Sequence, residues 1–231
     1  MALLAWSGAV LFALSLAYFL FSYAVTFGEP AAAGSAAGAV AWNTVLFPAF
    51  ALHHSVFARE RIRAWVARTV PPELERSAYV WVASVLFLAV CALWRPVPGV
   101  AWDMSGPWLW LLRALQLAGV WITLRSAAIL DVRELAGIIP TRTSPTRPTR
   151  PMEFTRIGPY GWVRHPIYTG WFLMVWAASP MTMTRLVFAV VSCFYLLVAI
   201  PFEERSLRRS SSGAYERYSS AVRWKLLLGV Y

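Results

Sequence analysis

Long apolar stretches are the feature that most constrains the fold of this chain. Four of them, each of about 20 residues, precede residue 131, and a helix of that length crosses the hydrocarbon core of a bilayer. They cover residues 2–27, 38–57, 78–94 and 108–130. A further apolar region, 167–202, is broken at Ser179 and Pro180 into a piece of about 14 residues and a longer piece at 184–202. These stretches predict an all-α, polytopic integral membrane protein with about six apolar helices, the last two forming a helical hairpin.

Composition favours a membrane protein over a soluble one. Hydrophobic residues make up 59% of the chain and charged residues 14%, whereas soluble domains carry about 25% charged residues. The net charge of +10 would indicate nucleic-acid binding in a soluble protein, but here the arginines cluster between apolar stretches. We therefore expect membrane lipids, and no nucleic acid, as partners. Cys91 and Cys193 lie inside apolar stretches without metal-ligand spacing, so neither a disulfide framework nor a metal site is expected.

The basic residues predict the orientation of the helices. Of the 21 lysines and arginines, 18 fall in the segments 59–76, 125–164 and 205–225, which a six-helix topology places on one face of the membrane. The exceptions are Arg95, Arg113 and Arg185. Because positively charged loops stay inside, we expect both termini and the functional site in the cytosol. The near absence of lysine beside abundant arginine hints at a GC-rich bacterial genome, so the expected location is a bacterial inner membrane. Residues 1–27 lack the charged start of a signal peptide, so we expect a retained first helix.

A long polar segment divides the chain. Residues 131–164 include the run PTRTSPTRPTRP, whose prolines lack backbone donors and disfavour both helix and sheet. We expect an irregular loop at 141–151. The chain is therefore divided into N-terminal transmembrane helices, 1–130, and a core at 131–231 that contains this loop, the helical hairpin and an interfacial C-terminal helix.

The stretch GPYGWVRHPIYTGW opens the hairpin and gathers polar groups at the start of an apolar helix. Pro166 suits the first turn of a helix, where its missing N–H would be unpaired in any case. The other N–H groups of that turn, the helix dipole and Arg164 all favour a bound anion. His165 and Tyr168 lie three residues apart and share a helical face. The stretch is either an anion-binding corner or a basic, aromatic helix start that anchors at the headgroups.

Two adjacent carboxylates, Glu203 and Glu204, end the second helix of the hairpin. The helix dipole disfavours negative charge there, so a cation is expected beside them, either a neighbouring arginine or a cationic ligand. Because the outer ends of a hairpin face one surface, the carboxylates should meet the corner around His165. A ligand with a carboxylate, an ammonium, a sulfonium and an aromatic base matches these features, and S-adenosylmethionine has all four.

Three motifs together carry a family resemblance. GPYGWVRHPIYTGW, then EERSL, then GAYERYSSAV resemble the signature of the isoprenylcysteine carboxyl methyltransferase and phospholipid methyltransferase superfamily, over residues 154–222. Earlier pieces, HHSVFAR and PPELERSAYV among them, resemble more specifically its bacterial branch, which includes NnrU-like proteins and methanethiol S-methyltransferases. The resemblance implies an integral membrane enzyme that transfers a methyl group from S-adenosylmethionine, with the cofactor bound by the core at 131–231.

The resemblance also implies site residues. Matched by motif, the cofactor contacts of the family fall on Tyr160, His165, Pro166, Ile167, Tyr168, Glu203 and Glu204. By this analogy the acidic pair, chiefly Glu203, holds the cofactor's ammonium group. Arg164 supports either the anionic end or the loop and is counted with the catalytic residues. Two departures stand out. Residues 198–201 lack the arginine with which prenylcysteine enzymes meet a substrate carboxylate, and Met152 replaces a histidine near the adenosine pocket.

His54, at the end of the second apolar stretch, is the candidate base. A neutral imidazole there can take a proton from a thiol or an amine, although an interfacial histidine bonded to backbone or headgroups is the alternative. The preferred reaction is S-methylation of a thiol or another small lipophilic acceptor. N-methylation of a phospholipid amine and a non-catalytic, NnrU-like accessory role remain alternatives. The sequence indicates no oligomeric state.

The tail repeats aromatic and apolar residues at helical spacing. Tyr215, Tyr218 and Val222 fall on one face of a helix within 205–222. We expect this segment to be an amphipathic lid that lies on the membrane.

Overall fold

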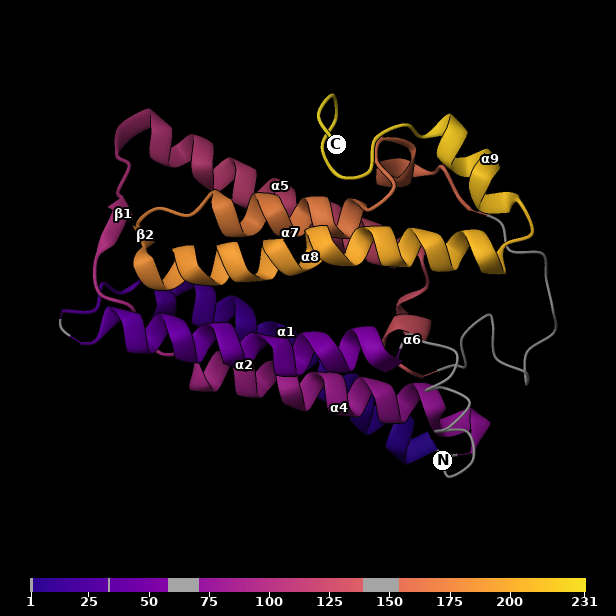
Figure 1. The fold of residues 1–231 in the computed structure, drawn as a ribbon, viewed down its shortest axis with the longest axis horizontal. Coiled ribbons are helices and arrows are strands. Elements are labelled where there is room, and N and C mark those ends of the chain that lie inside the picture. The colour runs from indigo at the N-terminus through magenta and orange to yellow at the C-terminus, as the bar shows by residue number, and fades with distance from the viewer. Residues whose placement is uncertain (1, 33, 58–70, 139–153) are drawn as a thin grey trace. The chain divides into compact units, whose positions relative to one another are not determined.

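The computed structural model describes residues 2–32, 34–57, 71–138 and 154–231, and most of them are helical (Figure 1). The helices are α1 (Ala2–Ala24), η1 (Thr26–Gly28), α2 (Ala36–Phe57), α4 (Pro72–Leu93), α5 (Gly106–Ile129), α6 (Val132–Leu135), η2 (Gly158–Gly161), α7 (Pro166–Trp176), α8 (Met183–Ser210) and α9 (Ala214–Ala221). Two short strands, β1 (Val100–Trp102) and β2 (Met181–Thr182), pair with each other. The loop expected at 141–151, the arginines expected at 59–68 and Met152 lie outside the described residues.

Five helices in the described part of the chain are long and apolar enough to cross a membrane. They are Leu3–Gly28, Ala36–His53, Leu74–Leu93, Gly106–Ile129 and Met183–Ser210. The sixth apolar helix, α7, has 11 residues and is about 16 Å long, which is too short to cross alone. The predicted all-α membrane protein with about six apolar helices is therefore confirmed, with a short first helix in the final pair.

The chain forms two compact units. The first contains Met1–Ala101, Asp131–Thr149 and Met181–Val187, and the second contains Trp102–Leu130, Arg150–Pro180 and Phe188–Tyr231. The functional division expected between residues 130 and 131 remains a prediction.

In the first unit a buried arginine closes the end of α1, which packs against α4. Arg185 is 2% exposed, and its Nε and Nη2 donate to the carbonyl oxygens of Tyr23 (2.8 Å) and Ala24 (2.7 Å). The last carbonyls of a helix have no partner within the helix, so the guanidinium satisfies them and opposes the helix dipole. A Cβ on Gly28 would lie 2.7 Å from Cζ of Arg185, so glycine leaves the room that this cation needs. Arg185 is one of the three basic residues outside the basic loop segments, and backbone carbonyls of the protein bind it.

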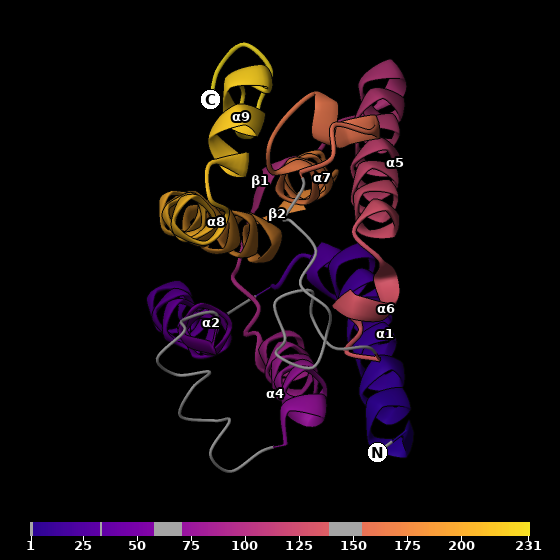
Figure 2. The ribbon, with the colours of Figure 1, turned by 90° about the vertical axis from the view of Figure 1, so that its right-hand side faces the viewer.

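In the second unit α5 and α7 lie side by side (Figure 1 and Figure 2). They approach closely at two glycines, because a Cβ on Gly119 would lie 2.6 Å from the carbonyl oxygen of Gly170. Small residues allow such close packing of helices in a membrane. Arg113 on α5 is exposed, but its guanidinium donates to the carbonyl oxygen of Ser179 at 3.0 Å, so a protein group meets part of this cation.

The tail is folded onto the protein. The helix expected at 205–222 is divided, because α8 runs on to Ser210 and α9 begins after Gly213, whose φ of 84° breaks the helix. Tyr215, Tyr218 and Val222 form a buried cluster, and Phe154 and Leu207 pack against it. The predicted helical face is confirmed, but it contacts protein.

Candidate functional site

The first part of the site is a tight turn that leads into α7. The turn η2 begins at Gly158, whose φ of 58° lies in the left-handed region that favours glycine. Tyr160 in this turn is buried, and its carbonyl oxygen accepts a hydrogen bond from the Tyr218 hydroxyl at 2.9 Å. Pro166 starts α7 as expected, with His165 immediately before it. The packing of α9 on the turn thus fixes where α7 begins.

The second part is the acidic end of α8. Glu203 lies about 30 Å along the helix from Met183, a distance equal to the hydrocarbon thickness of a bilayer. Consecutive residues of an α-helix point about 100° apart, so two adjacent carboxylates meet different surroundings. The Glu204 side chain is 8% exposed, whereas that of Glu203 is 44% exposed. The two glutamates are therefore not equivalent.

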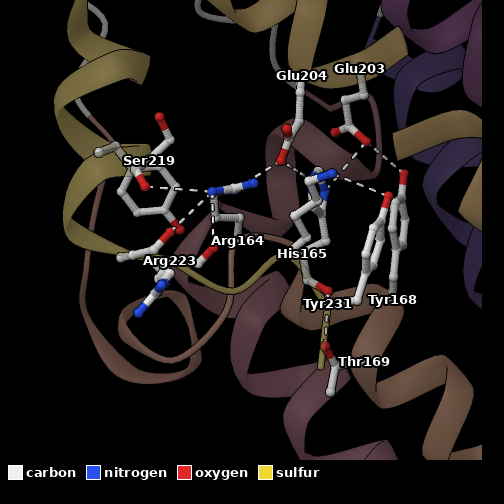
Figure 3. A network of polar contacts seen from close by, with 12 residues as sticks. Arg164, His165, Tyr168, Thr169, Glu203, Glu204, Ser219, Arg223 and Tyr231 are labelled. Atoms are coloured by element: carbon white, nitrogen blue, oxygen red, sulfur yellow. Dashed lines mark hydrogen bonds and ion pairs between the residues drawn. The ribbon is translucent and has the colours of Figure 1, made fainter. Parts of the chain in front are cut away.

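The two parts meet through direct contacts (Figure 3). Glu204 Oε1 accepts a hydrogen bond from Arg164 Nε at 2.8 Å and lies 3.3 Å from His165 Nε2. Glu203 Oε2 accepts one from the Tyr168 hydroxyl at 3.0 Å and lies 3.6 Å from His165 Nδ1. One buried imidazole thus faces both carboxylates. The expectation that the two ends of the hairpin converge is confirmed.

His165 and Tyr168 also form a parallel aromatic pair. Their ring centroids are 5.4 Å apart and the ring planes differ by 7°. The spacing of three residues on α7 produces this stack, as the shared helical face predicted. The stack orients the imidazole and the phenol together toward Glu203.

Arg164 has partners on two sides. Besides Glu204, its Nη1 donates to the carbonyl oxygens of Val222 and Arg223, each at 3.3 Å. These carbonyls follow the end of α9, where a helix leaves acceptors without internal partners. Arg164 therefore ties the end of α9 to Glu204. Its predicted support of the cofactor's anionic end remains a prediction.

Sequence reasoning missed the segment 223–231, which we call the C-terminal strap. The backbone N–H groups of Arg164 and His165 donate to the carbonyl oxygens of Trp224 and Lys225, both at 2.9 Å. Two N–H groups just before the proposed anion-binding turn are thus paired with the strap. The strap has neither helical nor strand periodicity, so no pattern marks it in the sequence.

Buried phenols lie around the acidic pair. Tyr160 was predicted as a cofactor contact, whereas Tyr215 and Tyr218 were not predicted as site residues. Burial together with the nearby charge of Glu204 raises the pKa of Tyr215, and burial raises the pKa of Tyr218 to about 12. Burial, with Tyr218 and Glu203 nearby, also raises the pKa of Tyr160. Helical spacing singled out Tyr215 and Tyr218, but as a membrane-facing surface. All three hydroxyls remain protonated at neutral pH.

The remaining expected residues are placed as follows. Ile167 is half-buried in the first turn of α7. His54 belongs to α2 in the first unit, and its side chain lies outside the described residues. Within the described residues, no three His, Cys, Asp or Glu side chains gather into a metal-binding set. The roles of these residues in binding and catalysis remain predictions.

Comparison with known proteins gives the family. The model of the isoprenylcysteine carboxyl methyltransferase family matches residues 144–209, which include both parts of the site. A methanethiol S-methyltransferase of Mycobacterium tuberculosis is 39% identical over 193 residues, covering 80% of this chain and 76% of that protein. Methanethiol S-methyltransferase 1 of Bradyrhizobium diazoefficiens is 37% identical, covering 81% and 67%. A methanethiol S-methyltransferase of a Pseudomonas strain is 32% identical, covering 92% and 84%. No solved structure matches the chain.

These matches confirm the expected class, an integral membrane methyltransferase. The likeness to NnrU-like proteins stays a prediction. On both the family match and the similarity along most of its length, the chain belongs to the isoprenylcysteine carboxyl methyltransferase family, in the branch of the methanethiol S-methyltransferases.

Proposed function

We propose that this protein transfers a methyl group from S-adenosylmethionine to the sulfur of a small thiol, at the site formed by α7, the end of α8 and α9. Several relatives are named methanethiol S-methyltransferase, and methanethiol is the proposed acceptor. The observation that carries the proposal is the unequal acidic pair. Glu204 is already matched by Arg164, while Glu203 beside it is open to a cationic ligand.

The residues present fit the proposed cofactor. Its ammonium and sulfonium groups are cations, and the half-exposed Glu203 carboxylate can accept further hydrogen bonds beyond the one from Tyr168. Charge-assisted hydrogen bonds of this kind are about twice as strong as neutral ones. His165, Tyr168 and Tyr160 would hold the adenosine and carboxylate ends, next to Pro166 and Ile167. The fit rests on the chemistry of these side chains.

When bound, the cofactor supplies a methyl group activated by a sulfonium. In the transfer that it would support, the thiol sulfur would gain the methyl group and give up its proton, and the donor would leave as a neutral thioether. Such a displacement depends mainly on alignment of the reactants and exclusion of water. On this chain α9 and the C-terminal strap cover one side of the site, and Glu203 orients the donor. We propose His54 as the group that takes the thiol proton.

The protein is an integral membrane protein. We further propose that it lies in a bacterial inner membrane with the site facing the cytosol. The support is the position of 18 of the 21 basic residues in segments on one face of a six-helix topology.

The decisive experiment measures cofactor binding and turnover in detergent micelles or nanodiscs. Isothermal titration should detect binding of S-adenosylmethionine, and labelled cofactor with methanethiol should yield labelled dimethyl sulfide. Glu203→Gln should weaken cofactor binding about 10- to 150-fold, because it removes the negative charge that faces the cofactor's cationic group. Glu216→Gln, which removes an exposed carboxylate from α9, is the matched control and should bind normally.

Three results would change this proposal. An unaltered affinity in Glu203→Gln would refute the assignment of that residue. Label that appears in phospholipid would favour an amine N-methyltransferase. Absence of binding at millimolar cofactor would favour a non-catalytic accessory role.

A further inference from the structure

The C-terminal strap is anchored at its start to the beginning of α7. Its Trp224 and Lys225 carbonyl oxygens accept the two N–H bonds described above, and the Thr169 hydroxyl donates to the carbonyl oxygen of Leu226 at 2.6 Å. The Leu226 side chain is buried. The strap therefore lies at the level where α7 begins its apolar run.

Beyond Leu226 the strap closes on itself and turns apolar side chains outward. The carbonyl oxygen of Tyr231 accepts hydrogen bonds from the N–H groups of residues 225, 226 and 227. The reversal uses Gly229, whose φ is 80°. Leu228 is 63% exposed and Val230 77% exposed, and Leu227 is exposed as well. Three neighbouring aliphatic side chains on one small loop form an apolar projection that water disfavours.

Basic side chains flank this projection. Arg223 is exposed and lies over the ring of Trp224, and the Lys225 ammonium lies 4.3 Å from the centroid of the Tyr231 ring. Aliphatic residues edged by cations and aromatic rings are the composition that binds an anionic membrane surface. By contrast, α9 buries its apolar face in the cluster of Tyr215, Tyr218 and Val222.

We propose that the strap, and not the apolar face of α9, docks the cytosolic side of the site onto the bilayer. Leu227, Leu228 and Val230 enter the headgroup boundary, and Arg223 and Lys225 bind the phosphates of anionic lipids. The bilayer surface then holds the strap against Arg164 and His165. This proposal does not depend on which acceptor the site methylates.

The test places a polarity-sensitive fluorophore on the full-length protein in vesicles. Leu228→Cys carries the label, and Ser220→Cys, at an exposed position of α9, is the matched control. Cys91 and Cys193 are buried, and unlabelled wild-type protein checks that they do not react. Lipid-attached quenchers should quench the label at 228 several-fold more than the label at 220, and aqueous iodide should do the reverse.

Lipid composition sharpens the result. Quenching at 228 by lipid-attached groups should increase when phosphatidylglycerol is added to phosphatidylcholine vesicles and should decrease with added salt. Arg223→Gln with Lys225→Gln should remove this dependence. Equal exposure of the labels at 228 and 220 to iodide would overturn the proposal. Self-quenching that follows protein density and ignores lipid would also overturn it, in favour of contact between two copies.

Discussion

Two buried arginines, one in each unit, bind the end of a helix, yet only one of them belongs to a candidate site. Arg185 donates to the last carbonyls of α1, and Arg164 donates to the carbonyls that follow α9. Both neutralise the negative end of a helix dipole. Arg164 differs because it also pairs with Glu204, and Glu203 stands next to that pair with nearly half of its side chain exposed.

The difference teaches that a buried cation is no sign of function in itself. Arg185 lies among backbone acceptors, so its bonds serve the fold. Around Arg164 the adjacent carboxylate is left accessible beside an oriented imidazole, which is the part that a ligand can use. Four predictions test this contrast and the packing beside it, and they are described from the largest expected effect to the smallest.

Arg164→Leu should cost about 3–5 kcal/mol in the free energy of unfolding, because it leaves the Glu204 carboxylate buried without a counter-charge. Denaturant titration in micelles measures this loss. Arg164→Leu combined with Glu204→Leu should recover much of it, because removing both charges of a buried pair is far less costly than removing one. A double variant less stable than the single one would contradict the pairing.

Arg185→Leu should cost about 3 kcal/mol in the same titration, because two buried carbonyl oxygens of α1 lose their donor. The remaining folded protein should bind S-adenosylmethionine with unchanged affinity, which is the control. If Arg185→Leu lowered the affinity for the cofactor without lowering stability, the proposed difference between the two arginines would be wrong.

Glu204→Gln should lower the free energy of unfolding by about 2 kcal/mol, since the hydrogen bond to the Arg164 guanidinium loses its charge. Glu203→Gln, one residue away, should change it by less than about 0.5 kcal/mol because that side chain is partly solvated. Thermal unfolding of both variants in one detergent compares them directly. Equal losses of stability in the two variants would contradict the view that Glu204 stabilises the fold while Glu203 is left to bind a ligand.

Tyr218→Phe should cost about 1 kcal/mol, because the hydrogen bond to the Tyr160 carbonyl oxygen is lost. The pKa of Tyr218 is about 12 in the folded protein and about 10 in an unfolded chain, so its hydroxyl stays protonated to a higher pH in the folded protein. Stability should therefore fall as pH rises from about 10 to about 12, and less so in Tyr218→Phe. Circular dichroism across this range measures the slope, and identical slopes would contradict the assignment.

Sequence periodicity predicted the apolar helices because a membrane requires backbone groups to be paired within each helix. It also predicted that His165 would meet Glu203, since the two ends of a hairpin share one surface. The tail's helical face followed from spacing alone.

The remaining features depend on hydrogen bonds between segments far apart in the chain, which no local pattern encodes. Arg185 counted only as an exception to the charge pattern, because its carbonyl partners on α1 lie about 160 residues earlier. Arg164 was predicted to support the cofactor's anionic end or the loop, because nothing in its own motif indicates the carbonyls after α9. The unequal exposure of Glu203 and Glu204 depends likewise on how the end of α8 packs.

The pairing of the strap with His165 has a consequence for biosynthesis. The carbonyl oxygen that this residue's N–H requires belongs to Lys225, which the ribosome adds 60 residues later. At about 5–20 residues per second, seconds pass between the synthesis of the imidazole and that of its backbone partner. The apolar helices can enter the bilayer before then. The candidate site can therefore take its final form only after translation has passed Lys225, and until then the His165 N–H lacks this backbone partner.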